Sequence, residues 1–439
     1  MRTPFLLLLL AACSAPVATP DGGSAGGGLS GSGGGGATGG GGAGGAAFDA
    51  GPPPVSHLDP SFGTNGCLQV PFNPASSDEF TSVTVTDDGT IWVAGAVTPA
   101  DAGDRSQSDA VAVVKVSSAG QLDTSFGDQG RVRFQLARTY HKVNALVPRA
   151  DGLVVAVAPT NQLLSLVKLT PSGALDRAFG DGGVVVTTAA PPSRVASLVV
   201  EEPGGLLVAS RGGFNELAFE RFGNDGQRQP SLRTGLQGFS PQGALRDFDG
   251  GLVVAGQAFS EMLLARVQPS DGGLDDTFAV SGKRRLAAGG TLVRSLVQLG
   301  DGSYRVVLHL NGPAVLVGAT KSGGVDARLS PDAGVVAIPG GTTDRGVEVK
   351  RGLFGVTAAF EDLSSDPEVG NTDMAVALLQ LDGGLDVSAP NGGYLVAHVP
   401  NQGGRALDLT RQADGKLLLV GQQTSPTTAT PVICRLIVP

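Results

Sequence analysis

The sequence predicts an all-β fold that is built from repeated units of four short strands. Three observations support this prediction: a phrase of the type Leu-Asp-x-x-Phe-Gly returns along the chain, an Asp-Gly or similar turn precedes an apolar run in each unit, and a further apolar run follows. Self-similarity at a period of about 50 residues indicates a repeat architecture, in which each unit buries its apolar face against its neighbours.

The first recurring element is the Leu-Asp phrase, which ends in a short β-branched strand. Its aspartate can accept hydrogen bonds from backbone amides two residues further on, and its glycine accepts a positive φ. We expect its phenylalanine to fill the space between units. A looser copy begins at Leu274 and keeps Phe278. The close copies lie at 58–63, 122–127 and 175–180.

The second recurring element is a tight turn between two apolar runs. Asp-Gly at such a position is the strongest short-range indication of a β-hairpin. A third apolar run follows each hairpin, so that each unit has four short strands, and no helical periodicity appears after the first residues of the chain. The turns lie at 88–89, 151–152, 204–205, 249–250, 301–302, 351–352 and 414–415.

Four strands repeated seven times predict a seven-bladed β-propeller over residues 55–439. This region starts on a fourth-strand phrase (58–72) and ends on a third-strand run (432–438). We therefore expect the N-terminal strand to complete the last blade. Pairing of the N- and C-terminal strands would close the ring and remove an exposed sheet edge.

This closure suggests a role for two of the three cysteines. Cys67 lies in the N-terminal strand and Cys434 in the C-terminal strand of the same expected blade. Disulfides persist in exported proteins, so we predict a Cys67–Cys434 disulfide. The alternative is two separate buried thiols, because cysteine is often simply a core residue.

The first residues resemble a bacterial export signal. Arg2 gives a positive start, and the apolar run 5–10 is too short to span a bilayer. Residues 10–13, Leu-Ala-Ala-Cys, resemble the lipobox of bacterial lipoproteins, which implies cleavage after residue 12 and acylation of Cys13. An ordinary signal peptide with an incidental cysteine is the alternative. Ser14, in place of an aspartate, implies an outer-membrane destination by the same resemblance.

The segment after Cys13 has the composition of a tether. Residues 21–54 are almost wholly Gly, Ala and Ser and end in three prolines. Such a segment has too little apolar surface to order itself, and its mean reach is roughly 35 Å by random-coil scaling. The expected order is therefore a signal peptide at 1–12, a lipidated cysteine with a disordered tether at 13–54, and the propeller at 55–439.

The spacing L-D-x-x-F-G-x-x-G-x-V, once in each unit of about 55 residues, resembles the delta-60 repeat family of bacterial β-propellers. The resemblance covers roughly residues 55–439 and rests on the three close copies. The copies at 325 and 385 keep only the hydrophobic residue and the aspartate, and the fourth unit (226–239) has lost both. The resemblance implies a propeller fold and an exported setting, and it implies no reaction.

Composition and spacing argue against several kinds of site. A net charge of −9 over 439 residues, with no basic run, argues against a nucleic-acid partner. Aromatic residues make up only 5% of the chain, which argues against a groove of stacking rings. His57, His141, His309 and His398 fall in different units without metal-ligand spacing. No residue stands out as a catalytic nucleophile, and no cofactor is predicted.

Unequal loop length points to a contact face. The connections between second and third strands are longest in units one, six and seven, at 96–109, 358–372 and 422–431. These units become consecutive once the ring closes, and insertions in repeat proteins map to one face, often the binding face. Two of the loops are acidic, which suits Ca²⁺ or a basic partner; solvated loops without a ligand are the alternative. The acidic residues are Asp101, Asp104, Asp109, Glu361, Asp362, Asp366, Glu368 and Asp373.

Together these features predict a membrane-anchored, exported lipoprotein of the bacterial cell envelope whose propeller acts as a binding or scaffolding module. The expected partners are the membrane, through the lipid on Cys13, and a protein or polysaccharide at the long loops. We expect the protein to be a monomer. Two alternatives stay open: an enzyme, as a hydrolase or lyase with its site in the central channel, and a structural envelope component without a specific ligand.

Overall fold

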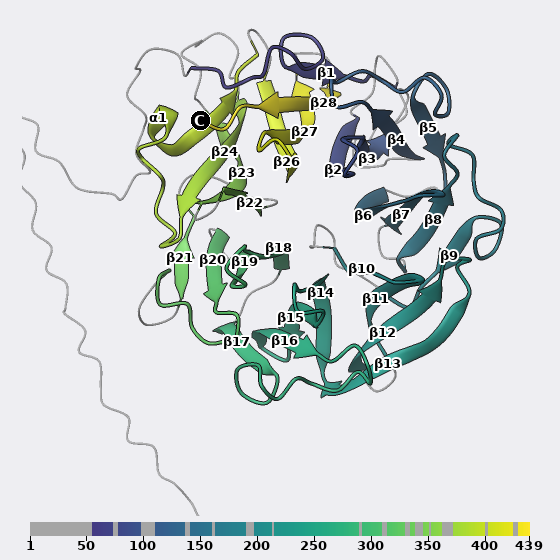
Figure 1. The fold of residues 1–439 in the computed structure, drawn as a ribbon, viewed down its shortest axis with the longest axis vertical. Helices are drawn as coiled ribbons and strands as arrows, with labels where there is room; N and C mark the ends of the chain where they lie inside the picture. The colour runs from purple at the N-terminus through teal and green to yellow at the C-terminus, as the bar shows by residue number, and fades with distance from the viewer. Residues whose placement is uncertain are drawn as a thin grey trace, which may run out of the picture. The chain divides into compact units, whose positions relative to one another are not determined.

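A computed structural model confirms an all-β propeller fold with four-stranded antiparallel blades (Figure 1). The predicted signal peptide (1–12) and tether (13–54) lie outside the residues that the structure describes. The structure describes residues 55–72, 78–97, 110–136, 141–159, 163–189, 197–212, 215–288, 292–309, 314–329, 334–338, 346–350, 353–361, 372–399, 403–424 and 429–439.

Within these residues, seven four-stranded sheets are present, and six of them run in simple chain order. The first sheet consists of β2 (Glu79–Val85), β3 (Ile91–Val97), β4 (Ala110–Val116) and β5 (Arg131–Phe134). The second consists of β6 (His141–Arg149), β7 (Gly152–Pro159), β8 (Ser165–Leu169) and β9 (Val184–Val186). The third consists of β10 (Val199–Glu202), β11 (Gly205–Arg211), β12 (Glu216–Gly223) and β13 (Arg228–Gln237). The fourth sheet consists of β14 (Phe239–Arg246), β15 (Leu252–Ala258), β16 (Glu261–Val267) and β17 (Lys283–Ala288). The fifth consists of β18 (Leu292–Gln298), β19 (Tyr304–His309), β20 (Ala314–Ala319) and β21 (Val335–Ala337). The sixth consists of β22 (Gly346–Lys350), β23 (Leu353–Glu361), β24 (Thr372–Gln380) and β25 (Tyr394–Ala397), and the helical turn α1 (Pro390–Gly393) comes directly before β25.

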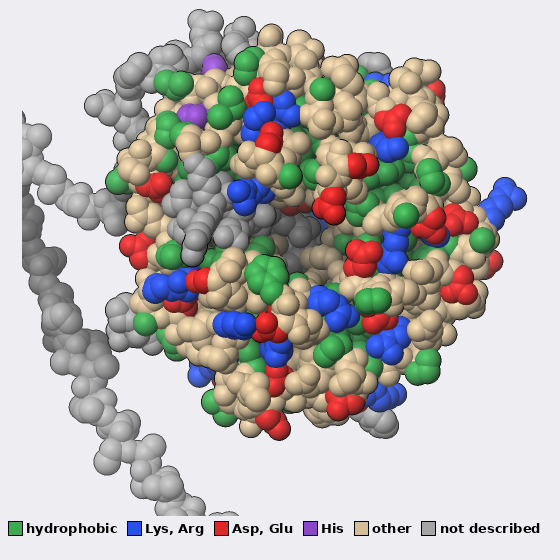
Figure 2. Space-filling view, viewed as in Figure 1, with side chains coloured by type: hydrophobic (Ala, Val, Ile, Leu, Met, Phe, Trp, Pro, Cys, Tyr) green, Lys and Arg blue, Asp and Glu red, His purple; other side chains and the backbone are tan. Residues whose placement is uncertain are grey.

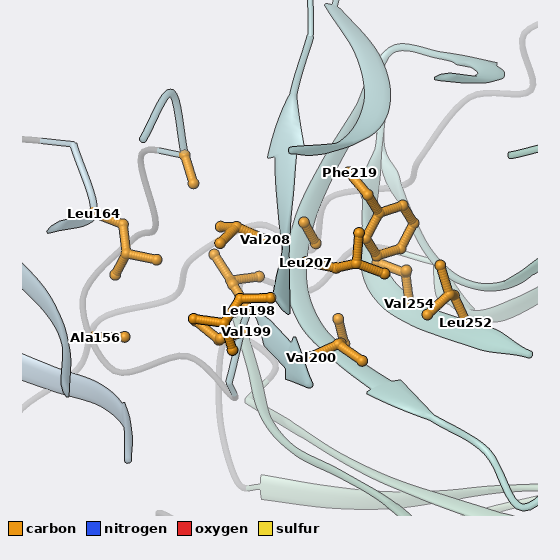
Figure 3. Close-up of a cluster of buried hydrophobic side chains, with 14 of the residues drawn as sticks. Ala156, Leu164, Leu198, Val199, Val200, Leu207, Val208, Phe219, Leu252 and Val254 are labelled. Atoms are coloured by element: carbon orange, nitrogen blue, oxygen red, sulfur yellow. The ribbon is translucent and has the colours of Figure 1, made fainter. Parts of the chain in front are cut away.

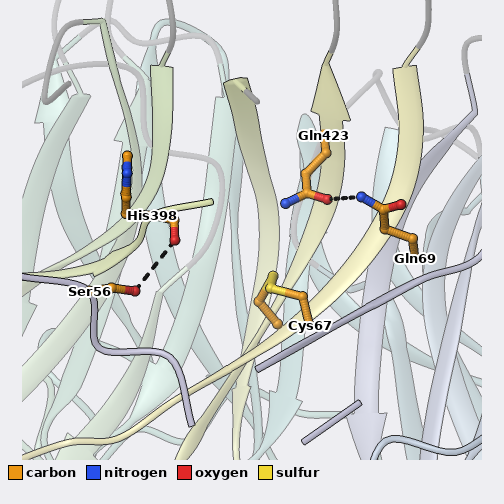
Figure 4. Close-up of a disulfide and its surroundings, with 6 residues drawn as sticks. Ser56, Cys67, Gln69, His398 and Gln423 are labelled. Atoms are coloured by element: carbon orange, nitrogen blue, oxygen red, sulfur yellow. Dashed lines mark hydrogen bonds between the residues drawn. A yellow bond between two sulfur atoms is a disulfide. The ribbon is translucent and has the colours of Figure 1, made fainter. Parts of the chain in front are cut away.

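The seventh sheet joins the two ends of the described chain. It consists of β26 (Gly403–Arg411), β27 (Leu417–Thr424), β28 (Ala429–Leu436) and, as its outermost strand, β1 (Cys67–Gln69). In the β1–β28 register Cys67 lies opposite Cys434, with a Cα–Cα distance of 4.1 Å, and the two residues form a disulfide (Figure 4). The disulfide prediction is therefore confirmed.

Residues 55–59, which we call the N-terminal strap, connect the seventh sheet to the sixth. The strap forms bridges from Leu58 to Leu436 in β28 and from Ser56 to Val396 in β25. Backbone hydrogen bonds of 2.9 Å link the His57 amide to the Val396 carbonyl and the Ile437 amide to the His57 carbonyl.

Neighbouring sheets pack against each other through the first strand of each sheet. β6 contacts β2 and β3, β18 contacts β14, and β22 contacts β18; β26 contacts both the preceding sheet and β2 of the first sheet. Apolar side chains fill these contacts. Figure 3 shows one such cluster, in which Leu198 and Val208 lie on the side of Ala156 and Leu164 of the sheet before, whereas Leu207 and Phe219 lie on the side of Leu252 and Val254 of the sheet after.

The phenylalanine of the Leu-Asp phrase packs between sheets, as predicted. Phe179 is buried, and Gly226 in the turn after β12 of the next sheet lies against its ring. Gly226 has a φ of +75°, and a Cβ atom there would lie 2.9 Å from the ring, so only glycine fits without a shift. The Gly180 amide also donates to the Asp225 carbonyl at 2.7 Å. The same arrangement joins Phe62 to Gly120 and Phe278 to Gly323.

The aspartate of the phrase accepts hydrogen bonds in its turn, as predicted, and it also forms an ion pair that the sequence did not reveal. Asp123 accepts hydrogen bonds from the amide (3.0 Å) and hydroxyl (2.6 Å) of Ser125, two residues further on. It also forms an ion pair of 2.8 Å with Lys115 in the third strand of its own sheet. Hydrogen bonds from Lys115 and Ser125 lower the pKa of Asp123 to about 2, against a smaller opposing effect of burial. Lys168 pairs with Asp176 in the same way.

Candidate functional site

The two ends of each sheet differ in their connections. Because each sheet is an antiparallel meander, the Asp-Gly turns between first and second strands lie at one end, which we call the turn end. The connections between second and third strands lie at the opposite end, which we call the loop end. The predicted contact face is therefore the loop end.

Two of the three predicted long loops are long connections, and the third is not. β3 ends at Val97 and β4 begins at Ala110, and β23 ends at Glu361 and β24 begins at Thr372. In the seventh sheet, however, only residues 425–428 separate β27 from β28, which corrects the expected loop over 422–431. Backbone pairing continues beyond the apolar run there, with Gln422 opposite Pro431 and Thr424 opposite Ala429. The two long connections flank a sheet whose central hairpin is extended as strand.

The predicted acidic residues fall into three groups. Glu361 is the last residue of β23, and its backbone pairs with Thr372. Asp373 lies in β24, and its side chain is only 2% exposed, so it is not an open loop carboxylate. Asp101, Asp104, Asp109, Asp362, Asp366 and Glu368 lie outside the described residues.

Asp373 is instead the partner of a histidine. Both of its carboxylate oxygens lie 3.2 Å from Nδ1 of His398, which follows β25. Burial raises the pKa of Asp373, and the neighbouring His398 opposes that shift. The strap also reaches this place, because the Ser56 hydroxyl lies 3.5 Å from the His398 carbonyl oxygen (Figure 4). The structure thus brings His57 and His398 to one seam, although they are far apart in sequence.

Three glutamines occupy the loop end of the seventh sheet. The Gln69 side-chain amide donates to the Gln423 carbonyl oxygen at 2.6 Å, between β1 and β27 (Figure 4). Gln422 donates to the carboxylate of Glu79 in β2, at 3.4 Å. The sequence predicts a loop at 422 and 423 and gives no role to Gln69; the signal for the first two is a pair of polar residues directly after the apolar run 417–421.

Several polar side chains of the innermost strands join neighbouring sheets. β6, β14 and β26 each have a register shift next to a polar residue: Asn144, Gln242 and Asp408. The Asn144 side chain accepts the amide of Leu198 at 2.9 Å, Gln242 that of Val293 at 2.8 Å, and Asp408 that of Val83 at 3.1 Å. These three side chains therefore satisfy backbone amides of the next sheet. In the described part of the chain, no three His, Cys, Asp or Glu residues are placed to hold a metal ion.

The turn end carries charge that is largely arranged in pairs. Figure 2 shows one face of the molecule, on which acidic and basic side chains alternate. At the turn end Asp247 pairs with Arg266 at 2.6 Å and accepts the Tyr304 hydroxyl at 2.9 Å. Lys321 pairs with Asp249 at 2.9 Å. Such pairing leaves little net charge to attract a ligand of one sign.

Comparisons with known proteins give structural similarities only. No protein-family model matches the chain, and no curated protein matches it. Among solved structures, it is similar to virginiamycin B lyase from Staphylococcus aureus in complex with quinupristin (12% identity over 84% of this chain and 99% of that chain, TM-score 0.48). It is also similar to a streptogramin B lyase structure (11%, 84% and 98%, 0.49) and to the Dos1 propeller (9%, 84% and 94%, 0.46). At these identities and TM-scores the similarities carry no argument about activity, ligand or partner.

One further finding bears on membrane association. In the part of the chain that the structure describes, no helix has the length and apolar character needed to cross a bilayer.

Proposed function

We propose that this protein is an exported lipoprotein, held at the outer membrane by acylated Cys13, whose propeller binds a partner at its loop end. The observation that carries the binding proposal is the position of the two longest connections between second and third strands. They run between β3 and β4 and between β23 and β24, and their sheets lie on either side of the seventh sheet. Long connections on a rigid scaffold are where binding residues concentrate.

We also propose that the seven sheets form one closed ring of seven blades. Pairing of β1 with β28, the Cys67–Cys434 disulfide and the contact of β26 with β2 support closure. A closed ring has no long exposed sheet edge and holds its loops in fixed relative positions. That rigidity suits a binding or scaffolding module.

The test of the binding proposal is a loop replacement in the full-length, lipid-bearing chain. Residues 98–109 and 362–371 are each replaced by a two-residue hairpin turn such as Phe259-Ser260, which connects β15 to β16. Proteins and polysaccharides cross-linked to this variant in intact cells are compared with those of the wild type. A matched control carries a substitution at the turn end, at the exposed residue Asp414.

We expect the loop variant to lose its specific cross-links while its unfolding transition stays close to that of the wild type, and the turn variant to keep them. Unchanged cross-links in the loop variant would contradict the proposal. Loss of cross-links in the turn variant alone would move the binding surface to the opposite end of the sheets.

A further inference from the structure

The seam between the sixth and seventh sheets carries a cluster of exposed aliphatic side chains. Among the described residues, ten large hydrophobic side chains are exposed, and three of them lie at this seam: Val55 (69% exposed), Val387 (75%) and Ile437 (44%). We call these three residues the seam patch. Three of the other seven lie in or beside the second sheet and three in connections of the fourth sheet, so the number of exposed side chains does not by itself distinguish the seam.

Hydrogen bonds hold the three segments of the seam patch together. The Val55 amide donates to the Asn391 side-chain oxygen at 3.3 Å, and the Asn391 side-chain amide donates to the Val55 carbonyl at 3.0 Å. Asn391 belongs to the turn that follows Val387, and the Ile437 amide donates to the carbonyl of His57 in the strap. The patch is therefore part of a fixed surface.

The seam also lacks the charges that the other copies of the phrase carry. Residues 55–58, 387–399 and 436–438 contain no Lys, Arg, Asp or Glu. The stretch of the first sheet that corresponds to 387–399 is 124–136, and it contains one aspartate and two arginines. Asp59 and Asp386, the nearest acidic residues in sequence, are buried. Burial also lowers the pKa of His57, so this ring is uncharged at neutral pH.

The position of the patch in the chain indicates what covers it. Residues 14–54 run from the proposed lipid site at Cys13 to Val55, which is itself part of the patch. A tether of this kind confines the seam near the membrane and raises the effective concentration of a weak apolar contact. An uncharged aliphatic surface suits the boundary between lipid headgroups and acyl chains.

We propose that the seam patch rests on the lipid bilayer to which Cys13 is anchored. The propeller then stands on its rim, at the seam of the sixth and seventh sheets, and both its loop end and its turn end face away from the bilayer surface. This inference rests on the proposed lipid anchoring and adds an orientation to it. It also explains how a membrane-held propeller keeps its loop end open to a partner.

The test uses the full-length, lipid-bearing protein in vesicles of phosphatidylethanolamine and phosphatidylglycerol that contain acyl-chain spin-labelled lipid as a quencher. A fluorescent label is attached to a single introduced cysteine, Val387→Cys, because Cys67 and Cys434 are bridged. The matched control is Val280→Cys: Val280 is 78% exposed and lies just before β17, a strand that Figure 1 shows across the molecule from β28. Vesicle flotation of each sample reports anchoring independently of the label.

We expect a large loss of fluorescence at position 387 and almost none at position 280, and Ile437→Asp should reduce the loss at 387. Equal fluorescence at both positions in protein that floats with the vesicles would overturn the seam contact while leaving the anchoring intact. Protein that does not float would overturn the anchoring and this inference with it.

Discussion

Reduction of the Cys67–Cys434 disulfide should destabilise the propeller substantially. The bond joins residues that are 367 positions apart, so it closes nearly the whole described chain into one loop. The loop-entropy relation gives about 6 kcal/mol for such a loop at 25 °C, as an upper value for a chain whose unfolded state has no residual structure. Cys434 is fully buried and Cys67 almost so, and reduction leaves both side chains in place, which limits the perturbation to the covalent bond.

The assay is guanidinium unfolding of the wild type with and without a phosphine reductant. The reduced protein should unfold at a clearly lower denaturant concentration, with a loss of several kcal/mol in the free energy of unfolding. The variant Cys67→Ala/Cys434→Ala is the matched control, because its transition should not respond to the reductant. A wild-type shift below about 1 kcal/mol would refute the reasoning, since the bond would then not constrain the unfolded chain.

Three further predictions concern packing and charge. Gly226→Ala should destabilise the protein by about 2 kcal/mol more than Gly204→Ala in thermal unfolding, because both glycines have positive φ but only Gly226 lies against a ring; equal effects would contradict this. Asp326→Ala should cost about 3–5 kcal/mol in denaturant unfolding, because it leaves the buried Arg305 without its 2.8 Å partner. Asp249→Ala, which breaks an exposed pair with Lys321, should cost less than about 1 kcal/mol, and a reversed order would refute the assignment. The pKa of folded Asp123 is about 2, below its unfolded value of about 3.9. The unfolded state therefore binds more protons in this range, so the free energy of unfolding should fall as the pH drops from about 4 towards 2; Asp123→Asn should show a weaker fall in the same titration.

Much of the fold follows from local patterns in the sequence. Asp-Gly turns between apolar runs determine hairpins through short-range backbone preferences, and the Leu-Asp phrase places Phe62 and Phe179 at equivalent positions between sheets. The offset between the first and last strands was enough to predict that Cys67 and Cys434 share a sheet. These features depend on spacing along the chain, which a sequence shows directly.

The features that the sequence did not reveal depend on contacts across sheets. The extended β27–β28 hairpin replaces an expected loop, because backbone pairing compensates for the lack of apolar residues at Gln422–Thr424. The sequence predicts Asp373 as an acidic residue of an exposed loop, whereas its side chain is buried and contacts His398, which follows β25. The pairing of the strap with β25 could not be predicted either, because Ser56 and Val396 are far apart in sequence and only the fold brings them together.

We propose an exported propeller that is anchored by a lipid on Cys13 and that carries a disulfide in the sheet joining its two ends. The decisive measurement is the intact mass of the membrane-extracted protein before and after reduction and alkylation of its thiols. We expect a chain that begins at an acylated Cys13 and has two thiols that alkylate only after reduction. A chain with an unmodified Cys13, or with Cys67 and Cys434 open to alkylation without reduction, would contradict it.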